Sequence, residues 1–160
     1  MGVLAELLQR ITKAGVFLGG AFLILAMLLT ISNILGRPLK IVIPGSYEIF
    51  ELIMVIPVGF ALVYAALKKY HVIVNLIVSR FPPRLGAAAE MLAAFLSFAI
   101  WGLMAYAGAS LAFETGLKEI SETLEIPYLP FRMVWIFCLF LFSLTYLLDL
   151  FLAFKRFVDK

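Results

Sequence analysis

The sequence predicts an all-α membrane protein with four transmembrane helices, on the strength of its composition, its low charge and the length of its apolar runs. Of the 160 residues, 64% are hydrophobic and only 14% are charged, whereas about 25% of the residues in a soluble domain are charged. The mean hydropathy is +1.09. This composition is typical of an integral membrane protein, and we expect a single membrane domain over residues 1–160.

Four apolar stretches account for the predicted spans. A helix needs about 20 apolar residues to cross the hydrocarbon core at a rise of about 1.5 Å per residue. The first and third stretches reach that length without a charged residue, whereas the second and fourth reach it only by including polar flanks. We therefore place the spans at about residues 14–36, 48–68, 88–113 and 132–154.

The second span begins with an acidic pair. Pro44 and Gly45 precede Ser46, which we expect to be the N-cap residue of the helix. Glu48 and Glu51 follow in its first turns, where the positive end of the helix dipole favours carboxylates. A carboxylate at the edge of the membrane also costs much less than one at its centre.

The connecting segments are amphipathic, and we expect them to form helices at the membrane interface. Residues 1–13 place an apolar stripe at helical spacing, which predicts a surface helix leading into the first span. The apolar part of residues 68–84 is too short to cross the membrane. Between the third and fourth spans, an apolar stripe is expected on one face of such a helix, and acidic residues face away from it. The stripe consists of Leu117, Ile120 and Leu124, and the acidic residues are Glu119, Glu122 and Glu125.

The distribution of basic residues predicts that both termini are cytoplasmic. With this orientation, nine of the thirteen Lys and Arg residues lie on the cytoplasmic side, and the other four are Arg37, Lys40, Lys118 and Arg132. The positive-inside rule favours that arrangement. The formal net charge of +3 is thereby explained by topology, so we do not expect a nucleic-acid partner.

Glu48 and Glu51 share one helix face because they are three residues apart. Three interpretations remain open: solvation at the interface, pairing with Arg37 or with a basic residue of a partner protein, and a proton or cation relay. The charge-free stretches of the first and third spans, residues 14–36 and 91–113, offer no continuation for a relay. Asn33, near the outer end of the first span, is placed to hydrogen-bond another helix.

The sequence shows no pattern that predicts catalysis. Cys138 and His71 are the single residues of their types, so neither a disulfide within the chain nor a cluster of His and Cys for a metal is expected. Without a nucleophile constellation or a phosphate-binding loop, the chain is expected to be a subunit, scaffold or anchor and not an enzyme.

Three segments together resemble the small membrane subunit (DctQ-like) of tripartite ATP-independent periplasmic (TRAP) transporters. They are NILGRPL at residues 33–39, the acidic second span with the basic turn and His segment up to residue 82, and TLEIPYLPFRMVWIFCLF at residues 123–140. The chain departs from the family pattern at Asn75, where Asp is frequent, and at Glu125, where Gly is frequent.

The resemblance implies a function and partners. It implies a bacterial inner-membrane protein that joins a large permease subunit and a periplasmic substrate-binding protein in an importer of organic acids. The family uses a sodium gradient instead of ATP, with substrate and sodium sites in the large subunit, so no cofactor is expected in this chain. The small subunit is expected to brace the large one and to enlarge the docking face for the binding protein.

Two sets of residues are the candidate contacts under this interpretation. A tether at the outer end of the second span would use Glu48 and Glu51 with Arg37 or a basic residue of the large subunit, near Asn33. Docking of the binding protein would use the acidic outer loop: Glu119, Glu122 and Glu125. The alternatives are a four-span transporter similar to small multidrug exporters, which carry a membrane-embedded Glu in their first span, and a generic assembly or anchor subunit.

Overall fold

Four long helices make up most of the chain. The computed structural model describes residues 2–41, 43–68 and 83–158. The helices are α1 (Gly2–Gly36), α2 (Ser46–Leu67), α4 (Pro83–Thr115) and α5 (Leu129–Val158), and a short 3₁₀ turn, η1 (Gly116–Lys118), follows α4. Each of the four long helices is long and apolar enough to cross a membrane. The predicted all-α fold with four spanning helices is therefore confirmed.

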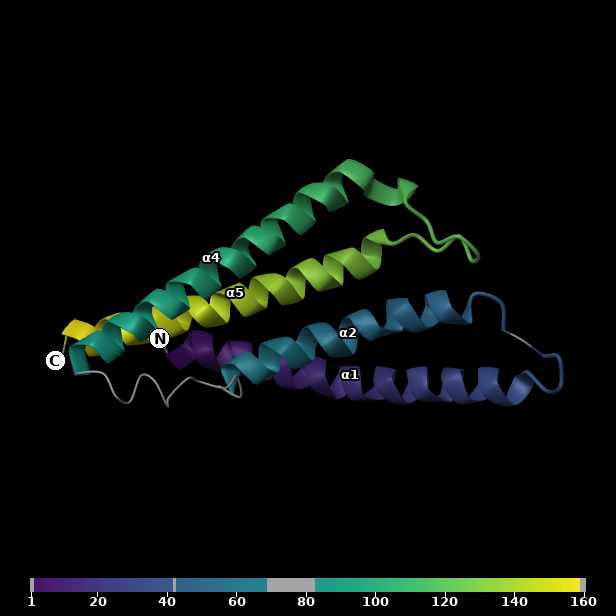
Figure 1. The fold of residues 1–160 in the computed structure, drawn as a ribbon, viewed down its shortest axis with the longest axis horizontal. Coiled ribbons are helices and arrows are strands. Elements are labelled where there is room, and N and C mark those ends of the chain that lie inside the picture. The colour runs from purple at the N-terminus through teal and green to yellow at the C-terminus, as the bar shows by residue number, and fades with distance from the viewer. Residues whose placement is uncertain (1, 42, 69–82, 159–160) are drawn as a thin grey trace.

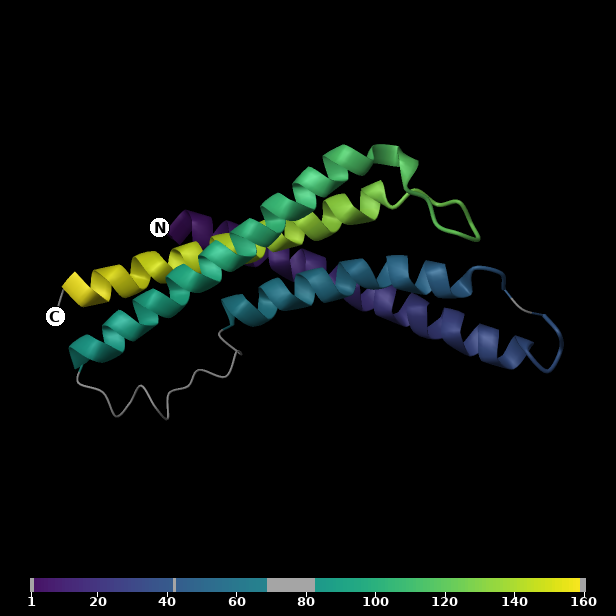
Figure 2. The same cartoon turned by 45° about the horizontal axis from the view of Figure 1, so that its top comes forward.

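The helices are arranged as two antiparallel pairs (Figure 1). α1 packs mainly on α2, α4 packs mainly on α5, and the two pairs meet through α2 and α5. α2 and α5 therefore occupy the middle of the molecule, with α1 and α4 on either side. Figures 1 and 2 both show the pairs diverging toward the end that carries the connections between α1 and α2 and between α4 and α5. We call this the loop end, and the opposite end the termini end.

The core lies where the two pairs converge. Its buried side chains come from three helices, and they are Leu8, Val63, Ala66, Cys138, Leu141 and Phe142. The Phe142 ring is packed edge-to-face against Trp101, with a centroid distance of 4.5 Å, and against Tyr146, with a centroid distance of 5.2 Å. Such aromatic pairs stabilise packing beyond the apolar area they bury, by about 0.5–1.5 kcal/mol each.

The predicted surface helix at the N-terminus is not a separate element. α1 continues without interruption from Gly2 to Gly36, which corresponds to about 50 Å at 1.5 Å per residue. Leu8 belongs to the apolar stripe that we expected on the membrane surface, but it is only 2% exposed, in the core. A break after residue 13 would withdraw Leu8 from this core, which explains why the helix runs on.

The connection between α4 and α5 also differs from the predicted amphipathic helix. Only η1 is helical, and residues 119–128 form a hairpin closed by an antiparallel bridge between Ile120 and Pro127. The Ser121 N–H donates to the Ile126 carbonyl (2.9 Å), and the Tyr128 N–H donates to the Glu119 carbonyl (3.1 Å). Gly116 and Glu125 both have positive φ, which a continuous helix does not permit. We call residues 119–128 the hairpin.

The segment between α2 and α4 was predicted to lie at the membrane interface. Most of this segment, residues 69–82, lies outside the described residues. The prediction for it, including the departure at Asn75, stays a prediction.

Glycines set the distance between neighbouring helices. A Cβ at Gly19 would lie 2.9 Å from the Pro57 Cα, and a Cβ at Gly59 would lie 2.7 Å from the Cys138 Sγ. These contacts join α1 to α2 and α2 to α5. Close approach at small residues is typical of packing between membrane helices. Gly19 and Gly59 therefore serve helix packing within this chain.

The charges separate between the two ends as the predicted topology requires. Lys68 follows α2 at the termini end, and the described basic residues near the chain ends belong to the same side. Arg37, Lys40 and Lys118 belong to connections at the loop end. The structure thus places both described chain ends on one side of the helices (Figure 1). Assignment of that side to the cytoplasm stays a prediction.

Candidate functional site

Glu48 joins the two helix pairs at the loop end. Its carboxylate accepts the backbone N–H of Thr123 (2.8 Å) and of Leu124 (3.1 Å), one on each oxygen. Glu48 lies in the first turn of α2, and Thr123 and Leu124 lie in the hairpin. One carboxylate thereby satisfies two amides that the turn leaves unpaired. We call this contact the clasp.

The side chain of Leu124 strengthens the clasp by packing on Gly45. A Cβ at Gly45 would lie 2.5 Å from the Leu124 Cγ, and Gly45 has φ of +67°. Both the backbone conformation and the space therefore require glycine at this position. The prediction that Ser46 caps α2 is wrong, because Gly45 occupies the N-cap position and no side chain caps the helix.

Ser46 has a different partner, which comes from the other helix of its pair. Asn33 Nδ2 donates to Ser46 Oγ at 2.8 Å and so links the end of α1 to the start of α2. Asn33 was expected to hydrogen-bond another helix, and within the chain it does so. This bond and the clasp therefore connect the first turn of α2 both to α1 and to the hairpin.

A second polar contact fixes the hairpin to the start of α5. Arg132 donates from both terminal nitrogens to the Glu119 carboxylate, with an ion-pair distance of 2.6 Å, and from one of them to Thr115 Oγ1 at 2.8 Å. This two-pronged geometry is the strong form of an Arg–carboxylate pair. Glu119 is thus engaged inside the chain, unlike the neighbouring acids of the hairpin.

Glu122 and Glu125 are exposed on the hairpin, and Glu114 is exposed at the end of α4. Glu125 stands in the turn with φ of +55°, a conformation that non-glycine residues adopt mainly in turns. The hairpin therefore presents two carboxylates outward at its tip. Its third acid, Glu119, is held by Arg132.

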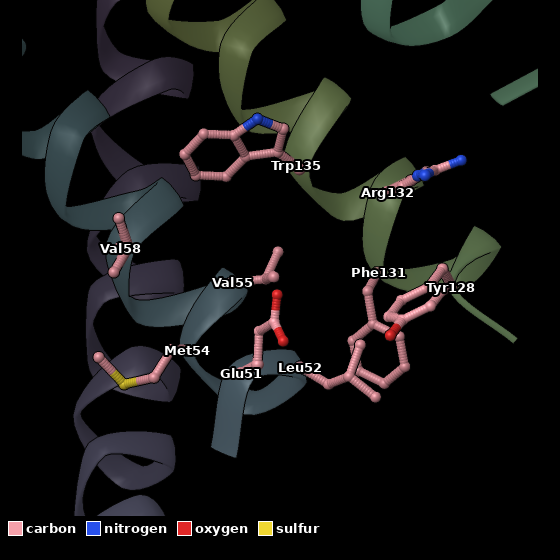
Figure 3. Close-up of a pocket in the computed structure, with 9 residues that line it drawn as sticks. All are labelled: Glu51, Leu52, Met54, Val55, Val58, Tyr128, Phe131, Arg132 and Trp135. Atoms are coloured by element: carbon pink, nitrogen blue, oxygen red, sulfur yellow. The ribbon is translucent and has the colours of Figure 1, made fainter. Parts of the chain in front are cut away.

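A cleft opens between α2 and α5 beside the clasp, as Figure 3 shows. Its volume is about 390 Å³, and we call it the α2–α5 cleft. Apolar side chains form most of its wall. The residues that line it are Glu51, Leu52, Met54, Val55, Val58, Tyr128, Phe131, Arg132 and Trp135.

Only one charge is directed into this cleft. The Glu51 carboxylate points into the space between the two helices, whereas the Arg132 guanidinium points away from it (Figure 3) toward its partners Glu119 and Thr115. Burial, together with the negative charges of Glu51 and Glu48, raises the pKa of Tyr128. The raised pKa favours the neutral phenol, whose O–H can donate a hydrogen bond.

The predicted tether residues do not pair as one unit. Within the described ranges, neither Glu48 nor Glu51 forms an ion pair with Arg37, and Glu51 has no hydrogen-bonding partner. Sequence reasoning missed Thr123 and Leu124 because they contribute backbone N–H groups, which any residue except proline carries. The part of the chain that the structure describes also contains no group of three or more His, Cys, Asp or Glu that could hold a metal.

A comparison with protein families gives a match for most of the chain. A family model described as the DctQ component of tripartite ATP-independent periplasmic transporters matches residues 26–156. These residues include the clasp, the hairpin and every residue that lines the α2–α5 cleft. Neither a search of curated proteins nor a search of solved structures found a match.

Proposed function

Because the chain belongs to the family of DctQ components of tripartite ATP-independent periplasmic transporters, we propose that it is the small, non-catalytic subunit of a sodium-coupled importer of organic acids. The observation that carries this proposal is the family match over residues 26–156. The DctQ family is a transporter component family and not a catalytic one. In this role the chain lies in the bacterial inner membrane and braces a large permease subunit.

The surface of the molecule supports a bracing role. α1 and α4 flank the molecule, and each exposes large apolar side chains along its length, such as Phe17 and Ile24 on α1 and Leu103 and Phe113 on α4. Residues 14–36 of α1 and 91–113 of α4 contain no charged residue, so the apolar parts of these two helices offer no Asp, Glu, Lys or Arg to an ion path. A four-span exporter with an embedded carboxylate in its first span is therefore disfavoured.

The loop end supports the second part of the proposal, which is docking of the substrate-binding protein. Glu122 and Glu125 are exposed at the tip of the hairpin, and the clasp and the Arg132–Glu119 pair hold the hairpin at both sides. A fixed acidic surface attracts a basic patch on the binding protein. This attraction increases the rate at which the two proteins associate at low salt.

The decisive experiment reconstitutes the transporter in sealed vesicles. We expect this chain alone to accumulate no organic acid under a sodium gradient, and we expect uptake only when the large subunit and the binding protein are also present. Co-purification with the large subunit is the first readout. Solute accumulation by this chain alone would overturn the proposal, as would failure of the two subunits to co-purify.

Docking is tested separately by charge removal from the hairpin. The double variant Glu122→Gln and Glu125→Gln should weaken binding of the substrate-binding protein severalfold at low salt and should reduce the salt dependence of the affinity. Glu90→Gln, which removes a carboxylate from α4 near the termini end, is the control and should bind normally. Unchanged affinity and unchanged salt dependence in the double variant would exclude the hairpin as a docking contact.

A further inference from the structure

We propose that the α2–α5 cleft receives an apolar segment of the large permease subunit that carries a lysine or arginine, and that this cation pairs with Glu51. The inference rests on the proposed function and assigns one specific surface of the chain to that partner. It also assigns different roles to the two carboxylates of the acidic pair. Glu48 forms the clasp within the chain, and Glu51 binds the partner subunit.

Glu51 has no partner within the part of the chain that the structure describes. Its carboxylate points into a cleft whose wall is formed mainly by apolar side chains (Figure 3), and it has no hydrogen bond or ion pair among the residues that the structure describes. Glu51 is five residues beyond the start of α2, about 8 Å along the helix axis. Glu51 is exposed in the subunit alone, so a partner can reach it. Once a partner covers the cleft, a carboxylate beside apolar side chains is stabilised by a cation that enters the cleft with that partner.

The described residues of this chain do not supply the cation. Arg132 is the basic residue that lines the cleft, but its guanidinium is directed away and is held by Glu119 and Thr115. The charge inside the cleft is therefore negative. The phosphate of an anionic phospholipid would lie close to Glu51 with no available guanidinium opposite, so charge complementarity favours a cationic group. A lysine or arginine side chain supplies that cation together with a polypeptide segment that fills the apolar cleft.

The size of the cleft limits what can enter it. A volume of about 390 Å³ holds several side chains but not a whole helix, whose diameter is about 10–12 Å with side chains. The partner segment must then lie along the opening and insert side chains between α2 and α5. Leu52, Val55 and Phe131 offer apolar contacts for them.

The experiment uses the two subunits co-expressed in membranes. A photoreactive benzophenone amino acid is placed at Val58, which lines the cleft and is 40% exposed, and the cross-linked product is mapped by mass spectrometry. We expect a cross-link to a segment of the large subunit that has a Lys or Arg within about two helical turns. A cross-link only to lipid, or to a segment without a basic residue, would overturn the inference.

Charge reversal tests the ion pair. Glu51→Lys should reduce both the Val58 cross-link and the recovery of the large subunit at least about tenfold, because like charges then meet in a desolvated contact. Glu114→Lys changes the charge equally, at an exposed position outside the cleft, and should leave both readouts unchanged. Equal behaviour of the two variants would contradict the proposal.

Two further measurements keep the result interpretable. The Glu51→Lys subunit, purified alone, should keep its helix content, and replacing the mapped basic residue of the large subunit by Glu should restore complex formation. Absence of this rescue would contradict the pairing. If the wild-type subunits do not co-purify, the proposed function fails. If they co-purify but the cleft does not cross-link to the large subunit, only this inference fails.

Discussion

Glu48 accepts two backbone N–H groups across the loop end, whereas Glu51, one turn further along α2, faces an apolar cleft. The sequence places both residues near the start of a membrane helix but does not distinguish them. Their difference follows from the hairpin, whose amides lie within reach of the first turn of α2 and not of the second. The two carboxylates should therefore respond differently to the same substitution.

Hydrogen exchange tests the role of Glu48 directly. Glu48→Gln should accelerate amide exchange at Thr123 and Leu124 severalfold, because an amide side chain is a weaker acceptor than a carboxylate and has only one oxygen. The measurement is exchange followed by mass spectrometry on the purified subunit. Glu51→Gln is the matched control and should leave the exchange rates of both amides unchanged. Equal protection of these amides in Glu48→Gln and the wild type would show that the clasp does not hold the hairpin.

Sequence reasoning identified the polar residues of the loop end but not all of their partners. Asn33 was correctly expected to bond another helix, and Glu48 was correctly placed in the first turn of α2. The expected Arg37 pairing within the chain is absent among the described residues. Backbone donors carry no side-chain signature, so Thr123 and Leu124 could be found only from the three-dimensional path of the hairpin.

The helices themselves were the most predictable elements, because a long apolar run has few alternatives in a membrane. The connection between α4 and α5 was less predictable. Its stripe of Leu117, Ile120 and Leu124 fits a helix, but Gly116 and Glu125 adopt positive φ and Leu124 packs on Gly45 instead. A tertiary contact with α2 has therefore overridden a local helical pattern.

Glycine substitutions test how closely α2 and α5 must approach. Gly59→Ala should lower the free energy of unfolding by about 1–3 kcal/mol, because the new methyl group would overlap Cys138. Gly20→Ala is the matched control in α1, where nothing lies within 4 Å of the added Cβ, and should be neutral or stabilising by about 0.5–1 kcal/mol. Titration with a denaturing detergent measures both variants.

The pairing of Gly59 with Cys138 makes a second check possible. Cys138→Ala removes the Sγ atom that lies 2.7 Å from the added Cβ. In the double variant, the loss of stability should then be smaller than the sum of the losses in the two single variants. Strict additivity would show that these two residues do not set the spacing between the helices.

For the molecule as a whole, the remaining prediction concerns its orientation in the membrane. Lys118 and Lys68 are exposed at opposite ends, and Cys138 is the single cysteine. In a Cys138→Ala background, a cysteine at Lys118 should react with a membrane-impermeant maleimide in spheroplasts, and a cysteine at Lys68 should react only after lysis. The reverse pattern would place the termini outside.

The clasp gives the molecule the geometry of a closed triangle. α2 and α5 form two sides that join at the core around Val63 and Phe142, and the hairpin forms the third side from the start of α5 to Glu48. With the hairpin attached to Glu48, the angle between α2 and α5 can change only if the hairpin changes its length or the clasp breaks. Without that attachment, the two helices would be joined only at the core. The hairpin thus acts as a crossbar, and a neighbour that forces α2 and α5 apart at the loop end must break the two hydrogen bonds of Glu48.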